Sequence, residues 1–308
     1  MKKKISVIGA GNVGATTAQL IVQSGLADVV LFDIVEGMPQ GKALDMAEAC
    51  PLWNSSSAIL GTNSYADTAG SDLIVITAGL ARKPGMSRND LLHANANIVR
   101  GVCSEVAPLS PNSILLIVTN PMDVMAQLAW KTTEFSCRRV LGMGGILDAA
   151  RLSAFLSWEL KVSPEDVEAL VLGGHGDDMV PLPRFTTVKG LPLTELLPRK
   201  KIQALIERTR NGGAEIVAYL KSGSAYYAPA ASTFQMIKAI LLDEKRVLPC
   251  AAYLNGEYGV KDLYMGVPVI LGKDGAEKVV EVKLSKEEKA QFRKSCASVA
   301  TLIKKLSI

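Results

Sequence analysis

A histidine enclosed by glycines is the first feature of this chain that suggests chemistry. The 308 residues contain two histidines, and one of them, His175, stands in the run GGHGD at residues 173–177. Glycine carries no side chain that would keep a ligand away from its neighbour. Imidazole also exchanges protons near neutral pH. The run therefore indicates a proton-transferring histidine, and the alternative is an ordinary loop histidine beside a turn. We expect the other histidine, His93, to lie on a helix surface without a role.

A carboxylate and a guanidinium group lie three residues apart in the segment before this run. Asp148 and Arg151 fall within a pattern that predicts a helix from about Leu147 to Leu160, so they share one helix face. One interpretation is a surface ion pair. The other is chemical: Asp148 orients His175 and favours its protonated form, while Arg151 binds a carboxylate through two parallel hydrogen bonds. The spacing alone does not bring the two segments together.

The N-terminal segment has the pattern of a dinucleotide site. A strand-like run, Ile5–Ile8, leads into the turn GAGNVG and then into a helical pattern over Val13–Gln23. Glycines allow a tight turn and a close backbone approach, and the N–H groups at the helix start bind phosphate. The residues expected to bind the cofactor here are Gly9, Ala10, Gly11, Asn12, Val13 and Gly14.

An acid at the end of the next strand identifies the nucleotide. Asp33 comes 19 residues after Gly14, where a carboxylate accepts hydrogen bonds from both ribose hydroxyls. Its charge would repel a 2′-phosphate, so the pattern favours NAD over NADP. The alternative is a glycine turn that binds no nucleotide.

Two further segments follow buried strands. After Leu73–Thr77 comes a Gly/Pro-containing loop with Arg82 and Arg88, which is either a solvated basic loop or a lid that closes on an anion. The strand Ile114–Val118 is followed by Thr119-Asn120-Pro121. Ligands bind outside the carboxyl ends of strands in open parallel sheets, so both segments point to the crevice beside the glycine turn.

The order of these elements predicts an α/β fold. Short Ile/Val-rich runs, among them Val29–Phe32, alternate with helical stretches such as Asn89–Val106, which implies parallel pairing and right-handed crossovers. We expect a Rossmann-type doubly wound parallel sheet over residues 1–145. A C-terminal α+β catalytic and substrate domain is expected over residues 146–308.

The second half predicts a different mixture of elements. The expected elements are a strand over Val167–Leu172, a hairpin over Phe185–Leu193, helices over Lys200–Leu220 and Pro229–Leu242, strands over Val267–Leu271 and Val279–Val282, and a C-terminal helix with Ser285 as its N-cap. The two lobes are expected to hold the site between them.

Composition excludes several classes of protein. The net charge is only +4, the lysines gather at the two ends, and aromatics make up 5%, so nucleic-acid binding has little support. Five widely spaced cysteines without a CxxC pair indicate reduced thiols, no metal site and a cytoplasmic protein. No apolar run is long enough to span a bilayer. The mean hydropathy of +0.22 suggests apolar surface that is buried in an oligomer.

With these motifs in place, the chain resembles the lactate/malate dehydrogenase superfamily, and most of all the lactate-dehydrogenase-like malate dehydrogenases of bacteria. The resemblance runs through nearly the whole chain. It is carried in order by Gly9–Gly14, Arg82-Lys83-Pro84-Gly85-Met86, Asn120-Pro121, Leu147-Asp148-x-x-Arg151 and the run at residues 173–177. The resemblance implies that His175 is the catalytic proton donor and acceptor, that Asp148 orients it, and that Arg88 polarises the reacting carbonyl.

The resemblance also implies the binding residues. Arg151 would bind the substrate's first carboxylate and Asn120 its oxygen. The cofactor would contact Asn95 and the backbone of Val118, Thr119 and Asn120. Ala225 matches a position at which the family lines the pocket wall. A homodimer or homotetramer is expected from the family.

The substrate depends on Arg82. Lactate enzymes of the family typically carry a neutral glutamine at the matching position, whereas an arginine suits the second carboxylate of malate or oxaloacetate. The expected function is therefore reversible oxidation of (S)-malate to oxaloacetate by hydride transfer to NAD, with His175 as general base and acid. The alternatives are a lactate or broad 2-hydroxyacid dehydrogenase and a dinucleotide-binding protein without turnover.

Overall fold

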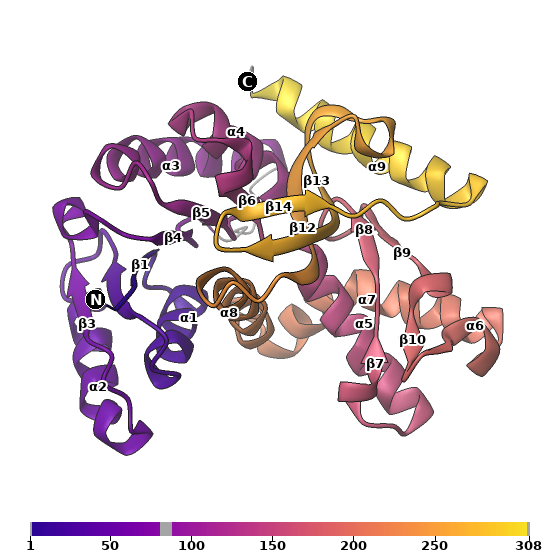
Figure 1. Ribbon diagram of the computed structural model, residues 1–308, viewed down its shortest axis with the longest axis horizontal. Coiled ribbons are helices and arrows are strands. Elements are labelled where there is room, and N and C mark those ends of the chain that lie inside the picture. Colours follow the sequence, from indigo (N-terminus) through magenta and orange to yellow (C-terminus); the bar gives the residue numbers. More distant parts are fainter. Residues whose placement is uncertain (1, 81–87, 307–308) are drawn as a thin grey trace.

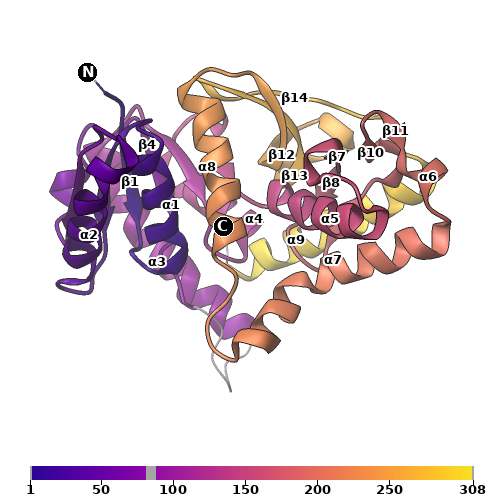
Figure 2. The ribbon, with the colours of Figure 1, turned by 90° about the horizontal axis from the view of Figure 1, so that it is seen from below.

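The computed structural model describes residues 2–80 and 88–306, with only the backbone of Arg88 included. Figures 1 and 2 show two lobes arranged along the longest axis, with the N-terminal elements in one and most of the C-terminal elements in the other. The largest apolar cluster contains the strands of the first lobe and extends into the long strands of the second. A smaller cluster lies within the second lobe, around residues 149–206.

The first lobe is built on a parallel sheet. Its strands are β1 (Lys4–Ile8), β2 (Asp28–Phe32), β3 (Ile59–Thr62), β4 (Leu73–Ile76), β5 (Ile114–Ile117) and β6 (Val140–Gly142). They pair in the order β3-β2-β1-β4-β5-β6, and every pair is parallel. The Ile, Val and Leu side chains of β4 and β5 are buried because helices cover both faces of the sheet. The expected Rossmann-type doubly wound sheet is confirmed.

Helices cover the two faces of this sheet. They are α1 (Asn12–Gln23), α2 (Met38–Trp53), α3 (Arg88–Leu109) and α4 (Met122–Thr133), with a 3-10 turn, η1 (Tyr65–Thr68). In Figure 1, α3 and α4 lie side by side above the strands, and α1 lies below them against α8 (Tyr227–Leu241). The strand order changes direction between β1 and β4, and ligands of such sheets bind at that switch point.

The second lobe joins the first through the sheet itself. Gly142 of β6 pairs with Ala251 of β12 (Arg246–Asn255), which forms a long antiparallel pair with β13 (Lys261–Gly272). The sheet then continues through β8 (Val171–Gly173) and β9 (Met179–Pro181), and β14 (Gly275–Val279) pairs with β13. A small separate sheet contains β7 (Val167–Glu168), β10 (Thr187–Val188) and β11 (Leu191–Pro192).

The remaining helices surround these strands. They are α5 (Gly145–Leu160), α6 (Leu193–Leu196), α7 (Arg199–Leu220) and α9 (Lys286–Lys305), with the 3-10 turns η2 (Cys137–Arg139), η3 (Pro164–Asp166), η4 (Pro183–Phe185) and η5 (Glu257–Gly259). The predicted helices that begin near Leu147, Lys200 and Pro229 correspond to α5, α7 and α8. The predicted hairpin is formed by β10 and β11.

Two predicted strands were wrong in their extent. The run Val167–Leu172 is split between two sheets, because β7 pairs with β10 whereas β8 pairs with β9 and β13. The strand predicted over Val279–Val282 ends at Val279 as the last residue of β14. Beyond it, the Val282 N–H donates to the Tyr258 hydroxyl instead of to a neighbouring strand.

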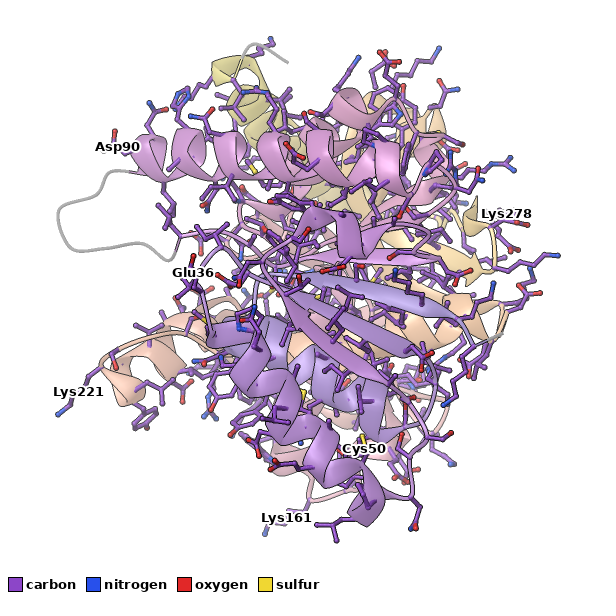
Figure 3. All side chains as sticks on the ribbon, turned by 90° about the vertical axis from the view of Figure 1, so that its left-hand side faces the viewer. Glu36, Cys50, Asp90, Lys161, Lys221 and Lys278 are labelled. Carbon is purple, nitrogen blue, oxygen red and sulfur yellow. The ribbon has the colours of Figure 1, made fainter. Side chains whose placement is uncertain are left out.

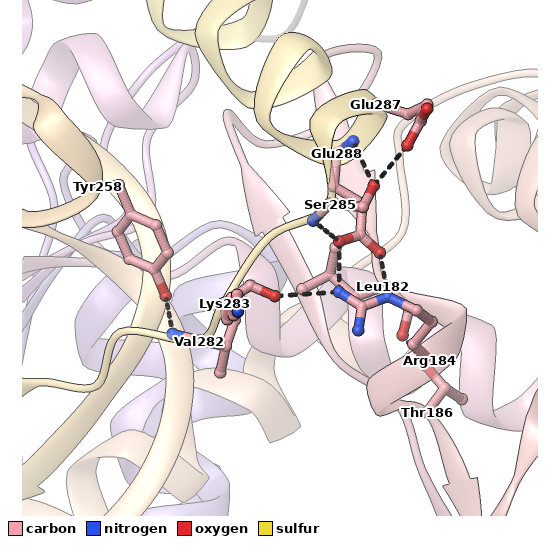
Figure 4. Close-up of polar contacts among 9 residues, drawn as sticks. All are labelled: Leu182, Arg184, Thr186, Tyr258, Val282, Lys283, Ser285, Glu287 and Glu288. Carbon is pink, nitrogen blue, oxygen red and sulfur yellow. Dashed lines mark hydrogen bonds and ion pairs between the residues drawn. The ribbon is translucent and has the colours of Figure 1, made fainter.

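The predicted N-cap of the last helix is confirmed. The Ser285 hydroxyl accepts a hydrogen bond from the Glu288 N–H, and the Glu288 carboxylate accepts one from the Ser285 N–H, which is a capping box. Figure 4 shows this arrangement together with Arg184, whose guanidinium donates twice to Glu288. The start of α9 is thereby tied to the segment that follows β9.

Two structural features are absent from residues 2–80 and 88–306. No helix there is long and apolar enough to cross a membrane. No group of three or more histidine, cysteine, aspartate or glutamate side chains there is arranged to hold a metal ion.

Candidate active site

The glycine turn after β1 leaves an open position at its centre. A Cβ atom on Gly9, where φ is +108°, would lie 2.7 Å from Thr77 Oγ1, and one on Gly14 would lie 1.8 Å from the Gly9 carbonyl oxygen. Packing within the chain therefore requires both glycines. A Cβ atom on Gly11 would meet no described atom within 4 Å. Packing leaves that position open, which fits the close approach of a bound group.

The start of α1 suits an anion in this opening. Gly11 is the N-cap, no side chain caps the helix, and its first turn holds no acidic residue. The first-turn N–H groups of an α-helix have no partner within the helix. Because α1 is 12 residues long, its N-terminus also carries a partial positive charge. These features fit the pyrophosphate of a dinucleotide.

Asp33 lies beside this turn, just beyond β2. Its Oδ2 accepts a hydrogen bond from the Ala10 N–H at 2.7 Å, and its Oδ1 accepts one from the Val35 N–H at 3.0 Å. Each carboxylate oxygen can accept a further hydrogen bond, so these bonds orient the acid without saturating it. Figure 3 shows this end of the sheet, with Glu36 after β2 and Asp90 in the first turn of α3 on the same side of the view.

The loops after β4 and β5 are joined by one buried amide. Asn95, on α3, is 1% exposed. Its Nδ2 donates to the Asn120 carbonyl oxygen at 2.8 Å, and its Oδ1 accepts from the Leu80 N–H at 2.8 Å. The Thr119 hydroxyl donates to the Ala78 carbonyl oxygen at 2.7 Å. Asn95 therefore holds the two loops together, and its direct contact with a cofactor stays a prediction.

The residues at the end of β5 occupy different depths. Val118 and Thr119 are buried, whereas Asn120 is exposed at the carboxyl edge of the sheet. The Asn120–Pro121 peptide bond is cis. Asn120 is thus open to a ligand on the same edge as Gly11.

The predicted histidine and aspartate are in contact. His175 Nδ1 lies 2.9 Å from Asp148 Oδ2, although the two residues come from the loop after β8 and from α5. Asp148 is 1% exposed, and 13% of the His175 side chain is exposed. Burial opposes the charged imidazole, but the negative charge of Asp148 and the hydrogen bond outweigh it, so the pKa of His175 is raised.

Arg151 lies on the other side of the same carboxylate. Its Nη1 is 3.8 Å from Asp148 Oδ1, and 14% of its side chain is exposed. Among the described residues, Arg151 Nε has no hydrogen-bond partner. A buried guanidinium with an unused N–H is suited to bind an anion, because that group is otherwise left unsatisfied.

Two glycines that the sequence-based prediction missed make room for this guanidinium. Gly212 and Gly213 lie inside α7, where each glycine costs about 1 kcal/mol relative to alanine. A Cβ atom on Gly212 would lie 3.3 Å from Arg151 Cδ, and one on Gly213 would lie 3.7 Å from Arg151 Nη2. A pair of glycines within a strong helical pattern is a signal that the helix packs closely against something.

Two further side chains that sequence reasoning missed hold the histidine loop. The His175 N–H donates to Asp123 Oδ2 at 2.9 Å, and the Gly174 N–H donates to Ser295 Oγ at 2.8 Å. Asp123 belongs to α4 and Ser295 to α9. An acid just after Asn120-Pro121 was the only sequence signal, and nothing in the sequence connects it with residue 175.

The remaining residues that the sequence singled out are two arginines, an alanine and a histidine. Arg82 and the Arg88 side chain lie outside the described residues. Ala225 is half-buried in the segment before α8. His93 is exposed on α3, as expected.

Comparisons with known proteins agree with this geometry. Residues 3–142 match the family model of the lactate/malate dehydrogenase NAD binding domain, and residues 146–307 match that of the lactate/malate dehydrogenase alpha/beta C-terminal domain. NAD is the cofactor that this first match describes, and the open glycine turn fits it.

Individual relatives cover nearly the whole chain. A malate dehydrogenase of Heliobacterium modesticaldum is 58% identical over 302 residues, which are 98% of both proteins. The structure of a malate dehydrogenase from Salinibacter ruber is 48% identical, with a TM-score of 0.95, and 99% of this chain and 97% of that one are covered. A lactate dehydrogenase of Cryptosporidium parvum, solved with lactic acid and nicotinamide adenine dinucleotide, is 41% identical, with a TM-score of 0.97 and coverage of 100% and 98%. Matches of this extent in both halves show that the chain belongs to the lactate/malate dehydrogenase family.

Proposed function

We propose that the protein is an NAD-dependent malate dehydrogenase, which catalyses the reversible oxidation of (S)-malate to oxaloacetate. The single observation that carries the proposal is the buried pair of His175 Nδ1 and Asp148 Oδ2 at 2.9 Å, with Arg151 beside it. Relatives at 53–58% identity that bear the name malate dehydrogenase support the choice of substrate.

The histidine provides the proton transfer. Because Nδ1 is held by Asp148, the second ring nitrogen, Nε2, is the one available to a substrate. In oxidation, neutral His175 takes the hydroxyl proton of malate at Nε2 while Asp148 stabilises the resulting positive charge. In reduction, the protonated ring returns that proton to the oxygen of oxaloacetate. Bound NAD supplies the two-electron acceptor and donor for this step.

The substrate's charges call for cationic partners. Arg151 is the described residue that would bind the carboxylate next to the reacting carbon, through the N–H groups that its ion pair with Asp148 leaves unused. We assign the second carboxylate to Arg82, polarisation of the reacting carbonyl to Arg88, and a hydrogen bond to the substrate oxygen to Asn120. The half-buried Ala225 would line the pocket wall.

Cofactor binding is assigned to the carboxyl edge of the sheet. The glycine turn at residues 9–14 would hold the pyrophosphate, Asp33 the ribose hydroxyls, and the segment at residues 118–120 the end that carries the nicotinamide. Asn95 would act here by holding together the loops that follow β4 and β5, in addition to any contact of its side chain with the cofactor. We propose a division into an NAD-binding domain over residues 1–145 and a catalytic domain over residues 146–308.

The wider setting is also proposed. Large apolar side chains on α2 and α5 are exposed, among them Leu52 at 84% and Trp158 at 63%, and an interface in a homodimer or homotetramer would cover them. None of the five cysteines forms a disulfide, which suits the reducing cytoplasm, and the oxidation of malate suits the tricarboxylic acid cycle.

A side-by-side assay tests the function. NADH oxidation by the purified protein is measured with oxaloacetate and with pyruvate, at several concentrations of each. We expect kcat/KM for oxaloacetate to exceed that for pyruvate by at least about tenfold, because an unpaired, desolvated guanidinium penalises pyruvate.

A lactate dehydrogenase is the second candidate, because the Cryptosporidium parvum lactate dehydrogenase shares the fold as closely as the malate enzymes do. Equal or reversed kcat/KM values would favour it. NADH binding without turnover of either acid would overturn both.

A further inference from the structure

A second carboxylate, apart from Asp148, lies against the catalytic histidine. Asp123 is in the first turn of α4 and is 5% exposed. Its Oδ2 accepts the His175 N–H at 2.9 Å. It therefore touches the backbone of the same residue whose ring is held by Asp148.

The histidine loop is fastened from two sides. Next to the Asp123 bond, the Gly174 N–H donates to the Ser295 hydroxyl of α9 at 2.8 Å. One bond is accepted by a charge and the other by a neutral oxygen. A neutral hydroxyl is sufficient to hold the backbone at Gly174, so holding the backbone at His175 does not by itself require a charged acceptor. The charge of Asp123 therefore needs a separate explanation.

Stability does not explain the carboxylate. Among residues 2–80 and 88–306, no hydrogen-bond partner reaches Asp123 Oδ1. Burial raises the pKa of Asp123 to about 6, so the acid is ionised at neutral pH with half of its hydrogen-bonding capacity unused. A buried charge in this condition costs free energy.

The charges around the imidazole come from several elements. Asp148 and Arg151 face it from α5, and Asp123 faces it from α4. Asp177 and Asp178 belong to its own loop, and the Ser298 hydroxyl donates to Asp178 Oδ2. Cys296 of α9 lies close to Asp123, and burial raises the pKa of that thiol to about 12, which keeps it neutral.

We propose that Asp123 is a positioning residue for the proton transfer, because its carboxylate fixes the backbone of His175 and adds a second negative charge that stabilises the protonated ring. Asp148 then sets the orientation of the ring, and the two acids together set how readily it holds its proton. This inference rests on the proposed function.

The matched variants are Asp123→Asn and Ser295→Ala. The first keeps an acceptor for the His175 N–H but removes the charge, while the second removes the neighbouring backbone bond and leaves every charge in place. The pH profiles of kcat/KM are measured for malate oxidation and for oxaloacetate reduction.

In each of the two kcat/KM profiles, one limb reports the ionisation of His175. In Asp123→Asn this limb should move to lower pH in both profiles, because the ring gives up its proton more readily. Relative to its own plateau, the variant should oxidise malate about threefold faster near pH 6 than the wild-type enzyme does, because the charge of Asp123 contributes to the raised pKa of His175. Ser295→Ala should lower the plateau without moving either limb. Unshifted limbs in Asp123→Asn would overturn the proposal.

A measurement that needs no turnover separates this inference from the proposed function. In a His93→Gln background, His175 is the one remaining histidine, and the ¹⁵N shifts of its imidazole can be titrated with and without Asp123→Asn. We expect the ring to titrate at lower pH in Asp123→Asn, and superimposable curves would overturn the inference. Loss of malate turnover alone, with the shift present, would overturn the proposed function instead.

If Asp123→Asn does not fold, the ¹⁵N titration curve of the His93→Gln protein tests the inference by itself. It should show a second inflection on the acid side of the ring titration, where Asp123 gains its proton, and a single-proton curve over the whole pH range in which the protein stays folded would overturn the inference.

Discussion

Two glycines of the same turn should separate folding from cofactor binding. Gly11→Ala places a methyl group where no described atom lies within 4 Å, at a φ of −64° that alanine adopts freely. Gly14→Ala places one 1.8 Å from the Gly9 carbonyl oxygen, which is backbone and cannot rotate away. We expect the first change to weaken NADH binding and the second to destabilise the fold.

The expected sizes follow from these contacts. Alanine at an N-cap in place of glycine costs less than about 1 kcal/mol, so Gly11→Ala should unfold almost as the wild-type protein does. If the methyl group removes one N–H bond to a charged phosphate, the loss is about 1.5–3 kcal/mol, or roughly tenfold to a hundredfold in Kd. For Gly14→Ala, overpacking of about 1–3 kcal/mol or more exceeds the gain of about 1 kcal/mol in helix propensity.

The assays are a fluorescence titration with NADH and denaturant unfolding of the apoprotein. Gly101→Ala is the matched control, because it adds a methyl group to open space in the exposed part of α3. It should leave the Kd unchanged. Wild-type affinity in Gly11→Ala would refute the argument that this position is open for a bound phosphate.

Three further substitutions test the binding of the substrate. Arg82→Gln should lower kcat/KM for oxaloacetate about tenfold to a hundredfold and raise the pyruvate-to-oxaloacetate ratio, as measured by NADH oxidation; an unchanged ratio would contradict the assignment of the second carboxylate. Gly212→Ala and Gly213→Ala should each gain up to about 1 kcal/mol of helix propensity, but only Gly212→Ala should raise KM for oxaloacetate, because its Cβ would lie 3.3 Å from Arg151 Cδ. Equal KM values in the two variants would show that the guanidinium tolerates the contact.

Local patterns predicted the first strand–turn–helix unit well. The run Ile5–Ile8 lies within β1, and α1 begins one residue before the predicted helix. Strand, turn and helix here follow from short-range effects, namely the continuous apolar run of a strand buried on both faces and the freedom of glycine. The same holds for Ser285, whose capping box is complete within four residues.

Two helices of the first lobe were not predicted, for opposite physical reasons. In α2, Leu44 and Leu52 are exposed, so the apolar residues do not mark the buried face. In α4, eight consecutive residues from Met122 to Ala129 are buried, so no polar face alternates with an apolar one. The hydrophobic period that identifies a helix is missing in α2, whereas in α4 the buried residues include the polar Asp123 and Gln127, which a hydrophobic pattern does not mark as core.

The site itself was predictable only in part. Local patterns singled out His175 and Asp148 and the resemblance implied their roles, but the two residues are 27 apart, and only the tertiary structure brings them within 2.9 Å. The Asp123 bond joins residues 52 apart, and the Ser295 bond spans 121. No local pattern encodes contacts of this range.

The raised pKa of Asp123 also predicts how the free energy of unfolding depends on pH. Because burial raises its pKa from 3.8 to about 6, the folded state holds this proton more tightly than the unfolded chain does. The resulting stabilisation is complete below about pH 3.8 and is lost as the pH rises through about 6. A shift of this size corresponds to at most about 3 kcal/mol, and coupling to the His175 proton reduces it.

Asp123→Asn has no such proton to lose. Compared with the wild-type protein, it should therefore gain about 1 kcal/mol of unfolding free energy between pH 5 and pH 8, as measured by denaturant unfolding at each pH. Groups that titrate alike in both proteins cancel from this comparison, and the lower pKa expected for His175 in the variant acts in the same direction as the lost carboxyl proton. A difference that does not change with pH would show that the carboxylate is not strained by burial. If the difference grows as expected, the chain carries a destabilising acid beside its catalytic histidine, and such a cost is characteristic of residues kept for activity.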